Sequence, residues 1–235
     1  MNKLIVVTGG SKGIGRSIIE RFMAAGFDAV ACARKTDDLK RLETETTSKL
    51  KESKLYTFTA DLAQPEQVKE FASFITSLNR SITVLVNNAG YFVPGSLADE
   101  PEGALEQMMD ANLFSAYRLT RCLLPTLKQQ GHGHIFNMCS VASIKAYANG
   151  GSYAVTKFAL LGFSKCLREE LKPWNIRVTA VMPGATLTAS WQGTHLPEER
   201  FMKAEDVADM VYACWAVSER SVVEEILIRP MQGDI

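Results

Sequence analysis

Short apolar runs alternate with segments of helical periodicity along almost the entire chain, and this alternation is the strongest constraint on its fold. We predict strands over residues 3–8, 27–33, 54–60, 82–86, 133–139, 176–182 and 225–229. Helical spacing of apolar residues predicts helices over 14–23, 65–78, 102–129, 151–171 and 204–217. Such alternation predicts an α/β fold, a doubly wound, Rossmann-like parallel sheet with helices on both faces. The 235 residues suffice for one such domain, so we expect 1–235 to form a single domain.

Composition and charge argue against several classes of function. Hydrophobic residues make up 46% of the chain and the formal net charge is zero, so we expect neither nucleic acid nor an anionic membrane as a partner. No apolar run approaches the roughly 20 residues that span a bilayer, and the first one is too short for a secretory signal. The five cysteines and three histidines lack metal-binding spacing, so we expect neither metal nor disulfides. These observations indicate a cytoplasmic protein.

A glycine-rich turn follows the first predicted strand and opens the first predicted helix. It reads Gly9-Gly10-Ser11-Lys12-Gly13-Ile14-Gly15. Glycines let the backbone approach a pyrophosphate, and a helix N-terminus offers free N–H groups and a positive dipole. The alternative is a tight turn that merely needs glycines. Because the turn joins a strand to a helix, we predict a dinucleotide-binding site.

Basic residues stand where an NAD site usually carries an acidic one. The second predicted strand ends in Ala33-Arg34-Lys35, and Lys12 lies inside the glycine turn. An acidic residue near this point would bind a ribose 2′-hydroxyl, whereas cations suit a 2′-phosphate. We therefore predict NADP(H) as the cofactor. The alternative is that Arg34 and Lys35 simply open the charged stretch 34–54 as a solvated helix face.

A hydroxyl, a phenol and an ammonium follow one another between residues 140 and 157. Ser140 ends a predicted buried strand, and Tyr153 and Lys157 lie four apart at the start of the predicted helix 151–171. A phenol with a pKa of about 10 is a poor acid-base group at neutral pH, and a neighbouring cation lowers that pKa. We predict proton transfer to or from a carbonyl or alcohol oxygen. The alternative is an ordinary helix with an exposed lysine and a half-buried tyrosine.

Several other polar or glycine-containing segments also follow predicted strands: Asp61-Leu62, Asn87 to Gly90, and Pro183 to Thr188. Ligands of doubly wound sheets bind outside the carboxyl ends of the strands. One crevice would therefore collect these segments together with the glycine turn, Ser140, Tyr153 and Lys157.

Together these motifs resemble the short-chain dehydrogenase/reductase family, of the compact single-domain type, over nearly the whole chain. The resemblance includes Thr8-Gly-x-x-x-Gly13-x-Gly15, Asp61, Asn87-Asn-Ala-Gly90, Asn112, Ser140, Tyr153-x-x-x-Lys157 and Pro183-Gly184. It implies that Tyr153 is the general acid/base, assisted by Lys157, that Ser140 positions the carbonyl, and that Asn112 holds a water linking Lys157 to solvent.

The resemblance also implies a set of cofactor contacts. These are Gly9, Ser11, Lys12, Gly13, Ile14, Gly15, Arg34, Asp61, Leu62, Asn88, Ala89, Gly90, Tyr153, Lys157, Pro183, Gly184, Thr186 and Thr188. The family commonly forms homodimers or homotetramers through the helices that span roughly 112–129 and 151–171 here. Cys139 departs from the pattern, since a second serine is frequent there. The segment 188–203 is short for a lid, and we expect its Trp191, His195 and Phe201 to pack within the lid rather than to contact substrate.

The resulting hypothesis is an NADPH-dependent carbonyl reductase acting on a small-molecule ketone or aldehyde. A 3-oxoacyl thioester, a pterin-like compound and a general or xenobiotic carbonyl compound all remain open as substrates. Two alternatives also remain open. One is a sensor or regulator that binds NADP(H) without turnover, and the other is an NAD-linked alcohol dehydrogenase.

Overall fold

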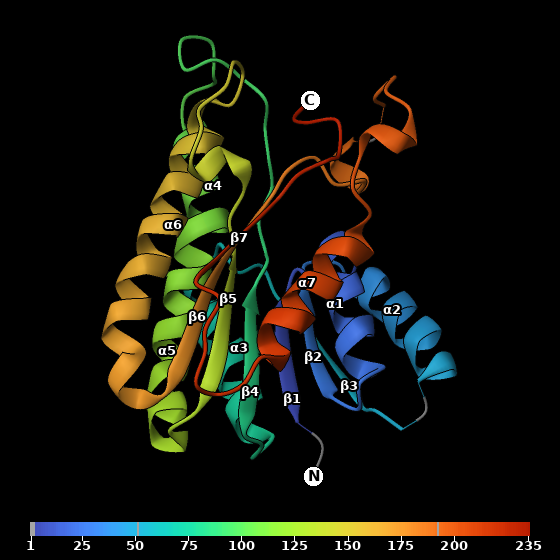
Figure 1. The fold of residues 1–235 in the computed structure, drawn as a ribbon, viewed down its shortest axis with the longest axis vertical. Coiled ribbons are helices and arrows are strands. Elements are labelled where there is room, and N and C mark those ends of the chain that lie inside the picture. The colour runs from blue at the N-terminus through green and yellow to red at the C-terminus, as the bar shows by residue number, and fades with distance from the viewer. Residues whose placement is uncertain (1–2, 51, 192) are drawn as a thin grey trace.

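A computed structural model describes residues 3–50, 52–191 and 193–235 of the chain. Seven parallel strands form one sheet in the order β3-β2-β1-β4-β5-β6-β7 (Figure 1). The strands are β1 (Leu4–Thr8), β2 (Asp28–Ala33), β3 (Leu55–Thr59), β4 (Ile82–Asn87), β5 (Gly133–Met138), β6 (Ile176–Pro183) and β7 (Glu225–Ile228). Each lies within a residue or two of its predicted range, which confirms the doubly wound fold.

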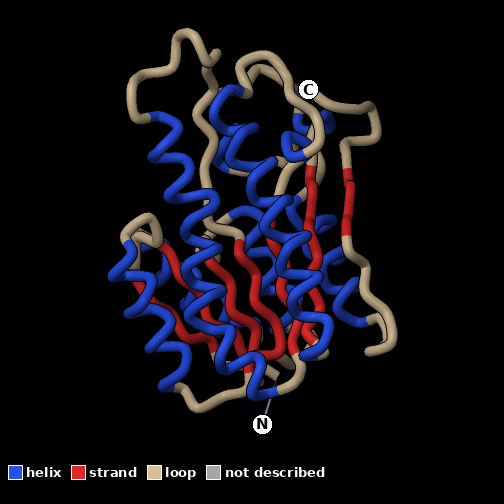
Figure 2. The backbone as a smooth tube through the Cα atoms, turned by 90° about the vertical axis from the view of Figure 1, so that its left-hand side faces the viewer, coloured by secondary structure: helices blue, strands red, loops and turns tan. Residues whose placement is uncertain are grey.

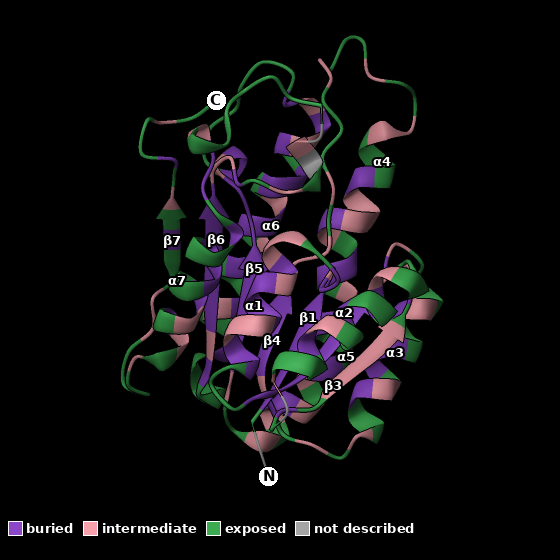
Figure 3. Ribbon diagram, turned by 90° about the vertical axis from the view of Figure 1, so that its right-hand side faces the viewer, coloured by how far each residue is buried: buried purple, intermediate pink, exposed green. Residues whose placement is uncertain are grey.

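Helices cover both faces of the sheet (Figures 1 and 2). They are α1 (Gly13–Met23), α2 (Thr36–Lys49), α3 (Pro65–Ser77), α4 (Ala104–Met109), α5 (Ser115–Gln130), α6 (Gly151–Leu171) and α7 (Ala204–Ala216). Alternate residues of a strand point to opposite faces. Ile5 and Val7 of β1 accordingly pack under α1, α2 and α7, whereas Leu4 and Val6 pack under α3, α5 and α6. The central strands are buried, and the exposed residues lie mainly on the outer sides of the helices and in loops (Figure 3).

The prediction of a single helix over 102–129 is wrong in one respect. A π-helical segment, Asp110–Phe114, separates α4 from α5 and contains Asn112. Pro125 lies inside α5. Single π turns within helices often occur at functional sites, and this one brings Asn112 against the loop that follows β4. Hydrophobic periodicity did not reveal it, because a π turn shifts the helical pattern by only one residue.

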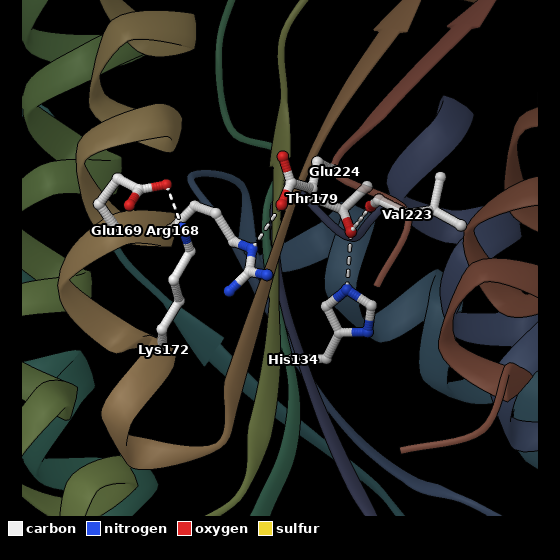
Figure 4. A network of polar contacts seen from close by, with 7 residues as sticks. All are labelled: His134, Arg168, Glu169, Lys172, Thr179, Val223 and Glu224. Carbon is white, nitrogen blue, oxygen red and sulfur yellow. Dashed lines mark hydrogen bonds and ion pairs between the residues drawn. The ribbon is translucent and has the colours of Figure 1, made fainter. Parts of the chain in front are cut away.

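A buried polar network joins β5, β6 and the segment before β7 (Figure 4). The Thr179 hydroxyl donates to the Val223 carbonyl oxygen at 2.6 Å, so Nε2 of His134 must be the donor in its 2.7 Å bond to Thr179 Oγ1. His134 is 1% exposed, and its Nδ1 has no hydrogen-bond partner among the described residues. Burial, with the nearby Arg177 guanidinium, lowers the pKa of His134 well below its usual value. The imidazole is therefore neutral in the folded protein.

This neutral histidine predicts a specific loss of stability in acid. Unfolding returns His134 to an ordinary pKa of about 6.5, so the unfolded state takes up a proton that the folded state refuses. The free energy of unfolding should be insensitive to this group above that pH. Below it, the contribution should fall by up to about 1.4 kcal/mol per pH unit. Urea unfolding at a series of pH values should show a shallower acid slope for His134→Gln. Equal slopes would contradict the prediction, since the exposed His132 and His195 are present in both proteins.

Candidate active site

The glycine turn between β1 and α1 requires its glycines for two separate reasons. Gly9 and Gly13 adopt φ values of +63° and +55°, in the left-handed region that favours glycine. At Gly15 a Cβ atom would lie 2.5 Å from both Gly9 O and Asn88 Nδ2, so the turn folds back onto the helix too closely for any side chain. The resulting cradle presents backbone and a helix N-terminus to the carboxyl edge of the sheet.

Asn88, the residue after β4, supports this turn. Its amide nitrogen donates to Thr8 O at 2.9 Å and to Gly9 O at 3.1 Å. In return, Thr8 Oγ1 accepts the backbone N–H groups of Asn88 and Ala89, both at 2.9 Å. Asn88 thus lines the crevice as expected, but the two hydrogens of its side-chain amide hold the turn.

One cavity of about 690 Å³ collects nearly all the residues expected at the site. Those that line it are Gly9, Ser11, Lys12, Gly13, Ile14, Arg34, Asp61, Leu62, Asn88, Ala89, Gly90, Ser140, Tyr153, Lys157, Pro183, Gly184, Thr186 and Thr188. Gly15 and Asn112 do not line it and stand behind its wall. The cavity runs along the carboxyl ends of the strands and joins the glycine cradle to Tyr153.

Ser140, Tyr153 and Lys157 meet at one end of this cavity. The Ser140 side chain lies near enough to the Tyr153 phenol to lower its pKa, and its hydroxyl accepts the Ala142 N–H at 3.1 Å. Lys157 is 6% exposed, and its Nζ lies 5.6 Å from the centre of the Tyr153 ring. The helical spacing therefore places the phenol and the ammonium side by side.

The electrostatics differ from the sequence-based expectation. Burial raises the pKa of Tyr153 above its usual value, the neighbouring Ser140 hydroxyl opposes this shift and Cys139 adds to it. Burial also lowers the pKa of Lys157 to about 8. The Lys157 ammonium donates to Met138 O at 2.7 Å, so the carbonyl, rather than the phenol oxygen, is its partner. Burial is therefore the largest influence on the pKa of both groups.

Asn112 makes three side-chain hydrogen bonds within the fold. Its amide nitrogen donates to Tyr91 O and to Thr156 Oγ1, both at 3.0 Å, and its Oδ1 accepts the Tyr91 N–H at 2.8 Å. Both amide hydrogens are thereby used within the fold, and the side chain ties the π segment to α6 and to the loop after β4. The water-binding role that the resemblance implies stays a prediction.

Cations gather at the opposite end of the cavity, beside the cradle. Lys12, Arg34 and Lys35 line this end together with Asp38, a carboxylate in the first turn of α2 that the sequence argument overlooked. Asp38 lies 3.4 Å from Lys12 Nζ in an exposed and therefore weak ion pair. Arg34 and Lys35 precede α2 and line the cavity. Three cations there meet the two carboxylates of Asp38 and Asp61, and the local charge is positive.

Sequence reasoning missed several residues that line the cavity near Tyr153. The Phe92 ring packs edge-on against Tyr153 with centroids 4.8 Å apart, and Tyr147 lies on the same wall. Asp234 and Ile235 reach the cavity from the segment after β7. Tyr147 lies between Ser140 and Tyr153 in the chain, so that position was an available signal. The segment after β7 offered none, because its location depends on the strand order.

The residues of the short lid segment 188–203 behave differently from one another. Trp191 lines the cavity and packs against Phe201 with ring centroids 4.9 Å apart. Phe201 is buried, and His195 is exposed. The expectation that Trp191 only packs within the lid is therefore too narrow.

A family model described as short chain dehydrogenase matches residues 3–198. The chain belongs to the short-chain dehydrogenase/reductase family. Sepiapterin reductase of Chlorobaculum tepidum is 33% identical over 243 residues, with 100% of this chain and 99% of that protein covered. Within the described residues, no helix is long and apolar enough to cross a membrane, and no group of three metal-ligating side chains is found.

Solved structures of family members share the fold over nearly the full chain. An alcohol dehydrogenase from the archaeon Thermococcus sibiricus, complexed with 5-hydroxy-NADP, has a TM-score of 0.91 and 26% identity, covering 98% of this chain and 97% of that one. L-sorbose reductase from Gluconobacter frateurii, complexed with NADPH and L-sorbose, has a TM-score of 0.89 and 28% identity, covering 97% of this chain and 95% of that one.

The close approach at Gly15 predicts a pair of opposite stability effects in this reductase-family fold. In Gly15→Ala the new methyl group would press on the Gly9 backbone, at a cost of about 1–3 kcal/mol. In Gly162→Ala, within α6, the methyl group meets no atom within 4 Å, and alanine gains about 1 kcal/mol of helix propensity. Urea unfolding of both variants measures the two effects. A Gly15→Ala protein as stable as the parent would contradict the cradle geometry.

Proposed function

We propose that the protein is an NADPH-dependent reductase of ketones or aldehydes. The observation that carries this proposal is that Ser140, Tyr153 and Lys157 line the same cavity as the glycine cradle. A carbonyl oxygen placed against the hydroxyl groups of Ser140 and Tyr153 would meet one proton donor and one positioning group.

The residues present fit a dinucleotide phosphate. The cradle presents backbone to the cavity at Gly9 and Gly13, where positive φ values favour glycine, and the start of α1 favours an anion. The positive end of the cavity suits an additional phosphate on the ribose. The NADP and NADPH complexes of the family members named above support the same choice. When bound, NADPH supplies the hydride that reduces the carbonyl carbon.

Tyr153 suits the role of general acid. Because burial raises its pKa, the phenol remains protonated at neutral pH and has a proton to give to the developing alkoxide. Ser140 is held by the Ala142 N–H, so its hydroxyl keeps a fixed orientation toward the phenol and the substrate oxygen. Lys157, anchored to Met138 O, provides a nearby positive charge that favours release of the phenolic proton as the reaction proceeds.

The substrate class stays open between a 3-oxoacyl thioester, a pterin-like compound and a general carbonyl compound. Sepiapterin reductase and L-sorbose reductase among the relatives show that the family accommodates chemically different carbonyls. We also expect a homodimer or homotetramer, because Phe114, Tyr117, Val155 and Phe158 of the π segment, α5 and α6 are 37–47% exposed.

Removing the phenolic hydroxyl should abolish the chemistry but not the binding of cofactor. We expect Tyr153→Phe to lose at least about a hundredfold in kcat with a carbonyl substrate, the range for loss of a general acid. NADPH affinity, measured by fluorescence titration, should stay within a few-fold. Tyr117→Phe, an exposed tyrosine of α5, is the matched control. Full turnover by Tyr153→Phe would refute the proposed role.

Charge reversal beside the cradle should change the choice of cofactor. Arg34→Asp removes one of three cations and adds a carboxylate able to bond a ribose hydroxyl. The ratio of kcat/KM for NADPH to that for NADH should fall by at least about tenfold, which corresponds to about 1.4 kcal/mol. Arg41→Asp, an exposed position on α2 outside the cavity, controls for net charge. An equal change in both variants would show that Arg34 does not read the 2′-phosphate.

A further inference from the structure

The loop after β4, residues 91–103, lies against the first turn of α6, the helix that carries Tyr153 and Lys157. Gly95 forms an isolated parallel bridge with Gly150, and its N–H donates to Asn149 O at 3.1 Å. These contacts join two segments more than fifty residues apart in the chain, which lie together beyond the carboxyl edge of the sheet (Figure 1).

Glu100 of this loop caps α6. Its Oε1 accepts the backbone N–H of Ser152 at 2.9 Å, and its Oε2 accepts the Ser152 hydroxyl hydrogen. The residue at the N-cap position, Gly150, has no side chain that could do this. A helix start leaves several N–H groups without intrahelical partners, and a carboxylate there also interacts favourably with the helix dipole. A side chain from a distant segment therefore completes the helix start.

Glycines make this approach possible on both sides. A Cβ atom at Gly151 would lie 2.1 Å from Glu100 Oε1, and one at Gly95 would lie 2.7 Å from Glu100 Cγ. The Gly150-Gly151 pair at the start of α6 thus leaves room for a carboxylate. The contact is too close to exist with any other residue at position 151.

Tyr153 directly follows the capped residue, and the same loop also holds the phenol ring. Phe92 packs edge-on against Tyr153 at 4.8 Å, and Asn112 bonds both the N–H and the carbonyl of Tyr91 next to it. The loop therefore contacts the start of α6 at the helix cap and at the ring of Tyr153. Loss of the cap would free the first turn, which is the part of α6 that positions the phenol against Ser140.

We infer that Glu100 is a positioning residue that, by capping α6 through Ser152, fixes the Tyr153 phenol against the Ser140 hydroxyl. The inference rests on the proposed function, because the position of Tyr153 affects turnover only if Tyr153 is the proton donor. A cap that merely stabilised the fold would change the melting temperature and leave the chemistry intact. The two roles are therefore separable by experiment.

The test compares Glu100→Ala and Glu100→Gln with Glu102→Ala, a neighbouring exposed carboxylate that forms no hydrogen bond or ion pair with the described residues. Glutamine keeps an acceptor for the Ser152 N–H and serves as the conservative rescue. For each variant we would measure kcat with a carbonyl substrate and KM for NADPH, well below the melting temperature. A second readout is the NMR signal and pH titration of isotope-labelled tyrosine, assigned to Tyr153 by its absence from Tyr153→Phe.

We expect Glu100→Ala to lower kcat about tenfold to a hundredfold, because small misplacements of reacting groups have effects of this size. The KM for NADPH should change by less than about threefold. The Tyr153 signal should shift in Glu100→Ala, return toward the parent in Glu100→Gln and stay unchanged in Glu102→Ala. A lower melting temperature with unchanged kcat and an unmoved Tyr153 signal would overturn the inference.

The inference also stays testable if Glu100→Ala does not fold or if the protein reduces no carbonyl. If Glu100→Ala does not fold, Ser152→Ala, which deletes only the hydroxyl partner, should shift the Tyr153 signal, and an unmoved signal there overturns the inference. If the unmodified protein reduces no carbonyl, the proposed function fails. The Tyr153 signal still decides whether Glu100 holds the phenol, because it requires no turnover.

Discussion

The pairing of β1 with β4 is the contact on which the site depends. β1 lies between β2 and β4, so the chain reverses its direction of winding there and the connections on either side diverge. The crevice left between them receives the glycine turn from one side and the Asn88 side chain from the other. The Thr8 hydroxyl, bonded to two N–H groups of the segment after β4, holds the two walls at a fixed separation.

Burial sets the chemistry of the groups at the far end of the crevice. It raises the pKa of Tyr153 and lowers that of Lys157, so both groups tend toward their uncharged forms. A protonated phenol is the form that can donate a proton to a carbonyl oxygen. Burial, rather than an attraction between phenol and ammonium, is thus the main influence on the pKa of Tyr153.

Three long-range contacts hold the start of α6. Asn112 bonds Thr156 from the π segment, Glu100 bonds Ser152 from the loop after β4, and Lys157 bonds the end of β5. Each comes from a different element, so the position of the phenol depends on the packing of much of the fold. The π segment makes the first of these contacts, and the Gly150-Gly151 pair leaves room for the second.

The sequence by itself determined the α/β class, the order of strands and helices along the chain, the glycine turn and the positions of Ser140, Tyr153 and Lys157. These follow from local patterns: apolar period, glycine placement and the shared face of residues four apart. Only the tertiary structure decided that Asn112 and Asn88 serve as braces, that Asp38 joins the cations, that Phe92 packs against the phenol and that Glu100 caps α6. The physical reason is that burial and long-range hydrogen bonds depend on which segments the strand order brings together, and no local pattern in the chain encodes that neighbourhood.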